Sequence, residues 1–166
     1  MKSALALAAL ALVVASTAAA QTNPPAYRIS ALQPFLFYND TGTFSGAIPK
    51  DAPLWNTIIG EGWARQSSNQ TLVRVTVAGE AGSYAPRRAV KLVVRRGTQS
   101  DSGKFTWGKV VLSRSEPLAV LTRRGTTQAG FWLYETGCVP LLLTASLTGQ
   151  TSPSTQTRVI PFACGE

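Results

Sequence analysis

Apolar and polar residues alternate along most of the chain in short runs, and turn-forming residues separate the runs. Between Thr71 and Ala78, for example, the valines occupy every second position and would share one face of a strand. Beyond the first twenty residues, few windows repeat apolar residues at the helical period. The pattern predicts strands over residues 35–38, 54–59, 71–78, 89–96, 105–112, 118–122, 130–134, 139–148 and 155–163.

Short strands at this spacing are typical of all-β proteins. We expect a single-domain antiparallel β-sandwich over residues 31–166, preceded by a lead-in over residues 21–30, with a small β-barrel as the alternative. The architecture would be immunoglobulin-like without the family signature. In that signature two cysteines on facing sheets bracket a tryptophan, whereas Cys138 and Cys164 both fall in the final hairpin.

The first twenty residues have the features of a secretory signal peptide. Lys2 gives a basic start, an apolar run follows from Leu5 to Val14, and three alanines from Ala18 to Ala20 supply a cleavage pattern. The apolar run is too short to span a bilayer. We therefore expect cleavage after Ala20, no transmembrane segment afterwards, and a secreted or periplasmic protein.

The two cysteines are expected to form a disulfide, because an oxidising compartment lets such thiols pair. A catalytic thiol would need a base, and a metal site would need more ligands than two sulfurs. Folding the final hairpin about Thr151 places residues whose numbers sum to 302 opposite each other, which puts Cys138 across from Cys164. The same register pairs Leu143 with Val159 and Leu142 with Ile160.

The composition removes much of the usual catalytic chemistry. The chain has no histidine, its one methionine is the first residue, and its eight acidic residues form no cluster. We therefore expect no metal, no cofactor and no enzymatic activity. The alternative is a carboxylate-based glycan hydrolase, which needs only two acids. Glu61, near Trp55 and Trp63, would be one of them, with Asp51 or Glu135 as candidates for the second.

The chain has a formal net charge of +8, and several of its basic residues lie on one expected strand and just before it. On that strand Arg87, Lys91 and Arg95 would share a face, opposite alternating valine and leucine side chains. Such a stripe would contact an anionic partner, or it would simply keep a strand soluble. The basic residues proposed for binding are Arg87, Arg88, Lys91, Arg95 and Arg96.

Two aromatic segments add candidate contacts. If Phe131 and Leu133 point inward, Trp132 and Tyr134 point outward and could stack on a sugar, unless another segment covers them. Basic and aromatic residues also interleave around Phe105 and Trp107, as in single-strand nucleic-acid binders. Export makes a nucleic-acid partner improbable, so we expect both rings to be core.

Taken together, these features favour an exported, non-enzymatic binding module. Its partner would be an anionic polysaccharide, a lipid head group or another exported protein, contacted through the basic strand. Besides the hydrolase, a structural or inhibitory secreted protein is a further alternative, with Gly79 to Pro86 as a display loop.

Overall fold

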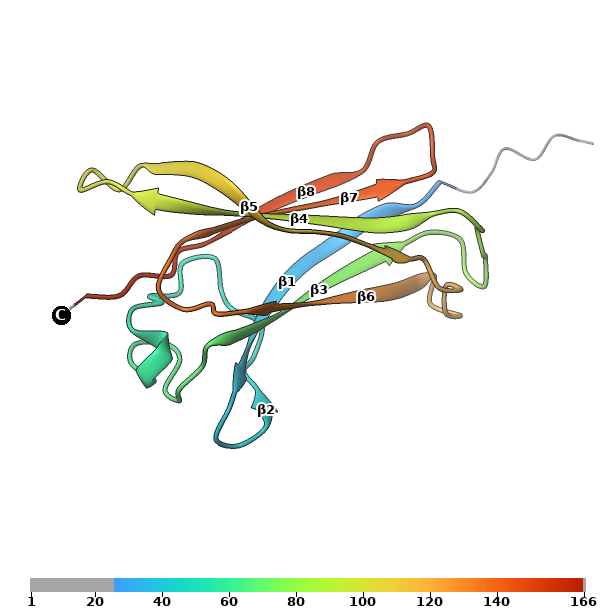
Figure 1. Ribbon diagram of the computed structural model, residues 1–166. Coiled ribbons are helices and arrows are strands. Elements are labelled where there is room, and N and C mark those ends of the chain that lie inside the picture. Colours follow the sequence, from blue (N-terminus) through green and yellow to red (C-terminus); the bar gives the residue numbers. More distant parts are fainter. Residues whose placement is uncertain (1–25, 166) are drawn as a thin grey trace, which may run out of the picture.

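The computed structural model describes residues 26–165, which form two antiparallel four-stranded sheets facing each other (Figure 1). The strand orders are β2-β1-β3-β6 and β5-β4-β7-β8. Neither sheet closes on itself, so the barrel alternative is wrong. The strands are β1 (Arg28–Tyr38), β2 (Thr43–Phe44), β3 (Gln70–Ala78), β4 (Ala89–Gln99), β5 (Phe105–Pro117), β6 (Thr126–Tyr134), β7 (Leu141–Thr148) and β8 (Thr155–Ile160).

One hydrophobic core fills the space between the sheets, because each central strand turns every second side chain inward. On β3 these side chains are the three valines that the sequence placed on one face, and all are fully buried. β4 supplies Val90, Leu92 and Val94 from the other sheet, and Phe131 of β6 packs into the same cluster. Burial of these alternating apolar faces fixes which face of each sheet is left for solvent.

Three expected segments differ in the structure. Residues 54–59 form no strand: the chain turns through a 3-10 helix at Thr57–Ile59, flanked by left-handed Asn56 and Gly60. Residues 118–122 form a loop whose Leu118 is buried. β1 starts at Arg28, inside the expected lead-in, because the residues on either side of Arg28 are buried in the core. The expected signal peptide, residues 1–20, lies outside the described residues.

The final hairpin forms, but its expected register is wrong by one residue. Leu141 pairs with Ile160, and Leu142 pairs with Val159. This register sets two buried side chains against each other, whereas the expected one opposed buried Ile160 to half-buried Leu142. A one-residue slip moves every partner to the other face, so core packing selects the observed register.

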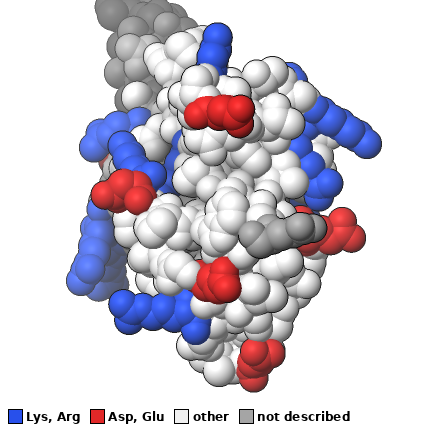
Figure 2. All heavy atoms as spheres, turned by 90° about the vertical axis from the view of Figure 1, so that its left-hand side faces the viewer, with Lys and Arg blue, Asp and Glu red and all other residues white. Residues whose placement is uncertain are grey.

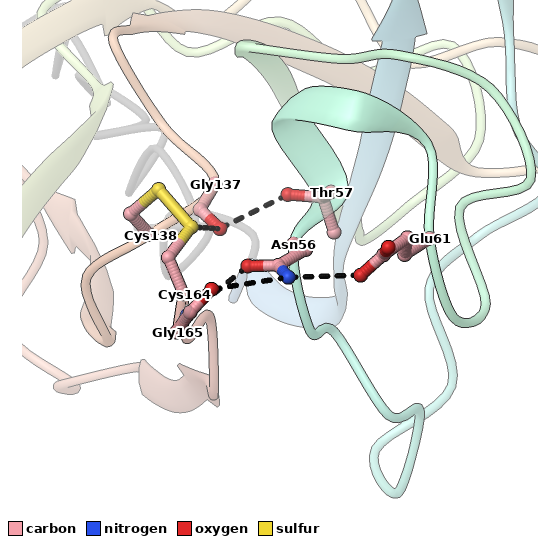
Figure 3. Close-up of a disulfide and its surroundings, with 7 residues drawn as sticks. All are labelled: Asn56, Thr57, Glu61, Gly137, Cys138, Cys164 and Gly165. Atoms are coloured by element: carbon pink, nitrogen blue, oxygen red, sulfur yellow. Dashed lines mark hydrogen bonds between the residues drawn. A yellow bond between two sulfur atoms is a disulfide. The ribbon is translucent and has the colours of Figure 1, made fainter.

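The disulfide between Cys138 and Cys164 is present, with the two Cα atoms 4.7 Å apart. Both cysteines lie beyond the ends of β7 and β8, so the bridge does not depend on the strand register. Around it, Thr57 Oγ1 donates to Gly137 O at 3.1 Å, and Gly165 N donates to Asn56 Oδ1 at 3.1 Å (Figure 3). The bridge therefore fastens two chain segments against the loop that carries the 3-10 helix.

Within residues 26–165, no helix has the length and apolar character needed to cross a membrane.

Candidate functional site

The outer face of the β2-β1-β3-β6 sheet carries a group of aromatic side chains. Residues directly opposite each other in an antiparallel sheet share a face. Phe37 of β1 is opposite Phe44 of β2 and Gln70 of β3, and Gln70 is opposite Tyr134 of β6. In the next row, Phe35, Leu72 and Trp132 are opposite one another. We call Phe35, Phe37, Phe44, Trp132 and Tyr134 the aromatic face.

Trp132 is the centre of this face. Its ring lies 5.4 Å from Phe37 in an edge-on arrangement, 5.7 Å from Phe44, and 6.4 Å from Tyr134 with nearly parallel planes. Phe37 and Phe44 are themselves 5.4 Å apart. Aromatic pairs at these separations attract each other, so the rings hold one another in place.

These rings remain accessible to solvent. Phe44, Trp132 and Tyr134 are 45%, 37% and 65% exposed, while Phe131 and Leu133 between and beside them are buried. The outward placement of Trp132 and Tyr134 thus follows the alternation that the sequence predicted. A contiguous exposed patch of large apolar side chains usually marks a contact surface.

A short hairpin positions Phe44. β1 turns back at Gly42, which has φ 65° and donates its N–H to Tyr38 O at 2.9 Å. Ser45 Oγ then accepts the N–H of Leu36 at 2.9 Å, which fixes the return strand against β1. The two-residue strand β2 thereby presents the Phe44 ring beside Phe37.

Amide side chains border the aromatic face. Asn39 Nδ2 donates to Asn69 Oδ1 at 2.8 Å, and both residues are exposed at the end of the sheet where Phe37 and Tyr134 lie. Gln70 stands between those two rings in the register, and Gln128 is exposed further along β6. Amides both donate and accept hydrogen bonds, so this border suits a ligand rich in hydroxyl groups.

Arg74 lies in the row next to the aromatic face, opposite Gln33 and Gly130, and its side chain is engaged. Arg74 Nη2 donates to Gln33 Oε1 at 2.9 Å, and its guanidinium lies 4.6 Å from the centre of the Phe35 ring. On β6, the residue opposite Arg74 is Gly130, which has no side chain.

The structure keeps part of the expected basic stripe and places the other proposed basic residues elsewhere. Arg87 precedes β4 with φ 72°, and Arg88 is only 7% exposed, with its guanidinium 4.4 Å from the Tyr27 ring. Lys91 and Arg95 share the outer face of β4. Arg96 points to the opposite side, where its Nη2 lies 4.0 Å from Glu135 Oε2.

Charged side chains on the surface are mixed in sign. In Figure 2, Lys and Arg side chains gather toward the two sides of the face in view, and Asp and Glu side chains lie among them. No single basic patch covers that face.

The expectation that Phe105 and Trp107 are core is wrong. Both are half-buried on β5, stacked on each other at 5.3 Å. Trp107 lies over Gly97 of β4, where a Cβ atom would stand 2.5 Å from the ring. The pair covers part of the β4–β5 hairpin instead of filling the space between the sheets.

Two of the three carboxylates proposed for hydrolysis have local partners, and the third, Asp51, is exposed. Glu61 Oε2 accepts from Asn56 Nδ2 at 2.8 Å, and Glu135 lies beside Arg96 (Figure 3 shows Glu61). Trp55 packs against Gly165 and is half exposed. Within residues 26–165, no three His, Cys, Asp or Glu side chains converge in a way that could hold a metal ion.

A cleft lies beside the aromatic face, at the open side of the two sheets. It has a volume of about 230 Å³, and its walls come from β4, β5, β7 and the C-terminal half of β6. Val94, Leu112, Leu133 and Leu141 are among its apolar lining residues, and Arg96 and Glu135 are among its polar ones. The alternation of apolar and polar residues does not predict this cleft, because the cleft depends on how β5 and β6 are placed across the two layers.

No family model matches this chain, and neither the curated proteins nor the solved structures contain a match to it.

Proposed function

We propose that this protein is an exported, non-enzymatic binding module that binds the ring faces of a glycan on its aromatic face. The observation that carries the proposal is the mutual contact of four rings on a solvent-exposed sheet face, with Trp132 at their centre. The disulfide supports export, because such bridges persist in oxidising compartments. The two-layer arrangement supports the expected β-sandwich, and its immunoglobulin-like character remains part of the proposal.

A glycan fits the chemistry of this surface. One face of a sugar ring presents C–H groups, which pack on aromatic rings, while the hydroxyl groups at its rim need donors and acceptors. The aromatic rings supply the surface on which the C–H groups pack. Asn39, Asn69 and Gln70 supply hydrogen-bond donors and acceptors for the hydroxyl groups. Arg74 is already bonded to Gln33 and stacked on Phe35, so the surface favours a neutral or weakly anionic sugar over a highly charged polymer.

The basic strand supports a binding role less well than the aromatic face does. Only Lys91 and Arg95 of the five proposed residues share the outer face of β4, and Arg88 is buried. The structure supports the hydrolase alternative less well, because, of four clefts in residues 26–165, one contains a carboxylate, that of Glu135. A display role for Gly79 to Pro86 remains an alternative, supported by the exposed Tyr84.

The test is a glycan array probed with the oxidised protein, followed by titration of the best oligosaccharide against three proteins: the parent, Tyr134→Ala and Tyr84→Ala. Both tyrosines are largely exposed, at 65% and 59%, so neither change should disturb the fold. We expect Tyr134→Ala to weaken binding about tenfold, which corresponds to about 1.4 kcal/mol. Tyr84→Ala should bind like the parent.

The proposal fails if no glycan on the array is retained, or if Tyr84→Ala and Tyr134→Ala weaken binding equally. Release of a bound glycan by 1 M salt would also contradict it, because stacking on neutral rings does not depend on ionic strength as charge pairing does.

A further inference from the structure

One edge of the β2-β1-β3-β6 sheet is open along β6. Gly79 N donates to Gly125 O at 2.9 Å just before β6 begins, and Thr136 N donates to Asn69 O at 2.9 Å just after it ends. Antiparallel ladders alternate between residues that bond to one neighbour and residues that face the other side. These two bonds therefore place Thr127, Ala129, Phe131 and Leu133 in the ladder with β3.

The intervening residues of β6 point their backbone groups away from β3. They are Gln128, Gly130 and Trp132, and the structure describes no strand pairing with β6 on that side within residues 26–165. The β3–β6 register continues without a shift over nine paired residues, so this edge is regular. It ends at Tyr134, and the next residue, Glu135, leaves the strand conformation with a positive φ of 54°.

The two sheets are also offset at this side. They are in closest contact where β1 faces β7 and β8, at the opposite side of the molecule. Since β2 is only two residues long, three full strands in one sheet face four in the other. β5 consequently extends past β6, and the apolar cleft lies at this offset, with Val111 and Leu112 of β5 exposed or half-buried in its wall.

The edge of β5 carries features that discourage strand pairing, whereas the edge of β6 carries none of them. On β5, Arg114 and Glu116 are opposite residues of β4 whose side chains point into the core. The side chains of Arg114 and Glu116 form an ion pair at 2.6 Å. The β4–β5 register also shifts twice. Inward-facing charges and bulges both protect edges from pairing. β6 has no charged residue along its length.

We propose that the edge of β6 binds an extended peptide segment of another protein, which adds as a fifth strand to this sheet. The segment would pair with the backbone of Gln128, Gly130 and Trp132, and its apolar side chains at alternate positions would enter the cleft against Leu112 and Leu133. Backbone pairing would supply affinity, and the cleft would supply specificity for aliphatic side chains. The cleft shares Trp132 and Tyr134 with the aromatic face, whereas Phe35, Phe37 and Phe44 belong to the glycan contact alone.

Selection from a phage library of random twelve-residue peptides on the oxidised protein tests this directly, followed by titration of the best synthetic peptide. Val111→Asp and Val110→Asp form a matched pair: the neighbouring valines are 40% and 38% exposed, and only Val111 lines the cleft. We expect selected peptides with aliphatic residues at alternate positions. Val111→Asp should raise the Kd about tenfold or more, because a carboxylate would be desolvated in the complex, and Val110→Asp should leave the Kd unchanged.

Amide hydrogen exchange locates the added strand. Saturating peptide should slow exchange at Gln128, Gly130 and Trp132 about tenfold or more, because their N–H groups become hydrogen-bonded. Slowing at Ser113 and Ser115, on the β5 edge, would overturn the proposal, as would equal weakening by both valine substitutions or a selection without an enriched pattern. Phe44→Ala separates the two proposals, because Phe44 is 45% exposed, contacts Trp132 and does not line the cleft. It should weaken glycan binding and leave peptide binding within about twofold.

Discussion

Removal of the disulfide should destabilise the protein by a predictable amount. The bridge joins residues 26 apart in sequence. By the chain-entropy relation, a closed loop of this length stabilises the folded state by about 3.5 kcal/mol at 25 °C. Cys164 is exposed and Cys138 is half-buried, so Cys→Ser changes bury no new polar group deeply. For a domain of this size, the loss corresponds to a decrease in Tm of about 7–14 °C.

Urea unfolding of the parent, the Cys138→Ser/Cys164→Ser protein and the reduced parent measures this free energy of unfolding. The reduced parent and the double variant should agree, because both lack only the bridge. The destabilisation should be local at first. Amide hydrogen exchange should accelerate first at Asn56 to Gly60, because the bridged segments contact these residues through Gly137 and Gly165. A loss below about 1 kcal/mol, or acceleration spread evenly over both sheets, would refute the reasoning.

Two further substitutions test local packing, each against a matched control in urea unfolding. Gly149→Ala should lower the free energy of unfolding by about 2 kcal/mol or more, because φ is 78° and the new Cβ would meet Arg87 O at 2.4 Å. Its control is Gly42→Ala, where φ is 65° and no atom lies within 4 Å of the new Cβ. This change should cost only the strain of the left-handed conformation, about 1 kcal/mol. Arg88→Met should cost about 2 kcal/mol through lost stacking on Tyr27, while Arg87→Met, on the exposed neighbour, should stay within about 0.5 kcal/mol. Equal effects within either pair would contradict these packing contacts.

The sequence predicts strands well where one side chain in two is apolar. β3 and β7 were found almost to their ends, because their valines and leucines mark the buried face directly. It failed over residues 54–59, whose apolar run resembles a strand. There the left-handed conformations of Asn56 and Gly60 and the contact with Gly137 decide the structure. Those contacts join residues about 80 positions apart, which a local pattern does not contain.

The disulfide shows how a correct conclusion can follow from an inexact register. The prediction assumed that the turn was centred on Thr151, which made Cys138 and Cys164 direct partners. In the observed β7–β8 ladder the centre of the turn lies half a residue earlier. The hydrogen bond that Leu147 N donates to Ser154 O at 3.0 Å shows this register. The cysteines still meet because they lie beyond the ladder. The apolar faces of the two strands contained the correct register, since Leu141 and Ile160 are both buried.

The candidate site was half visible in the sequence, and the reason is topological. Alternation along β6 placed Trp132 and Tyr134 outward, but their neighbours Phe37 and Phe44 come from strands about 90 residues earlier, joined only through β3. In the basic stretch, alternation along β4 placed Lys91 and Arg95 on one face as predicted, and it sends Arg96 to the other face. The burial of Arg88 against Tyr27 depends on a contact that the local pattern does not contain. In a β protein, residues two apart on one strand and residues on paired strands form a surface together, so a contact surface follows from strand order more than from local composition.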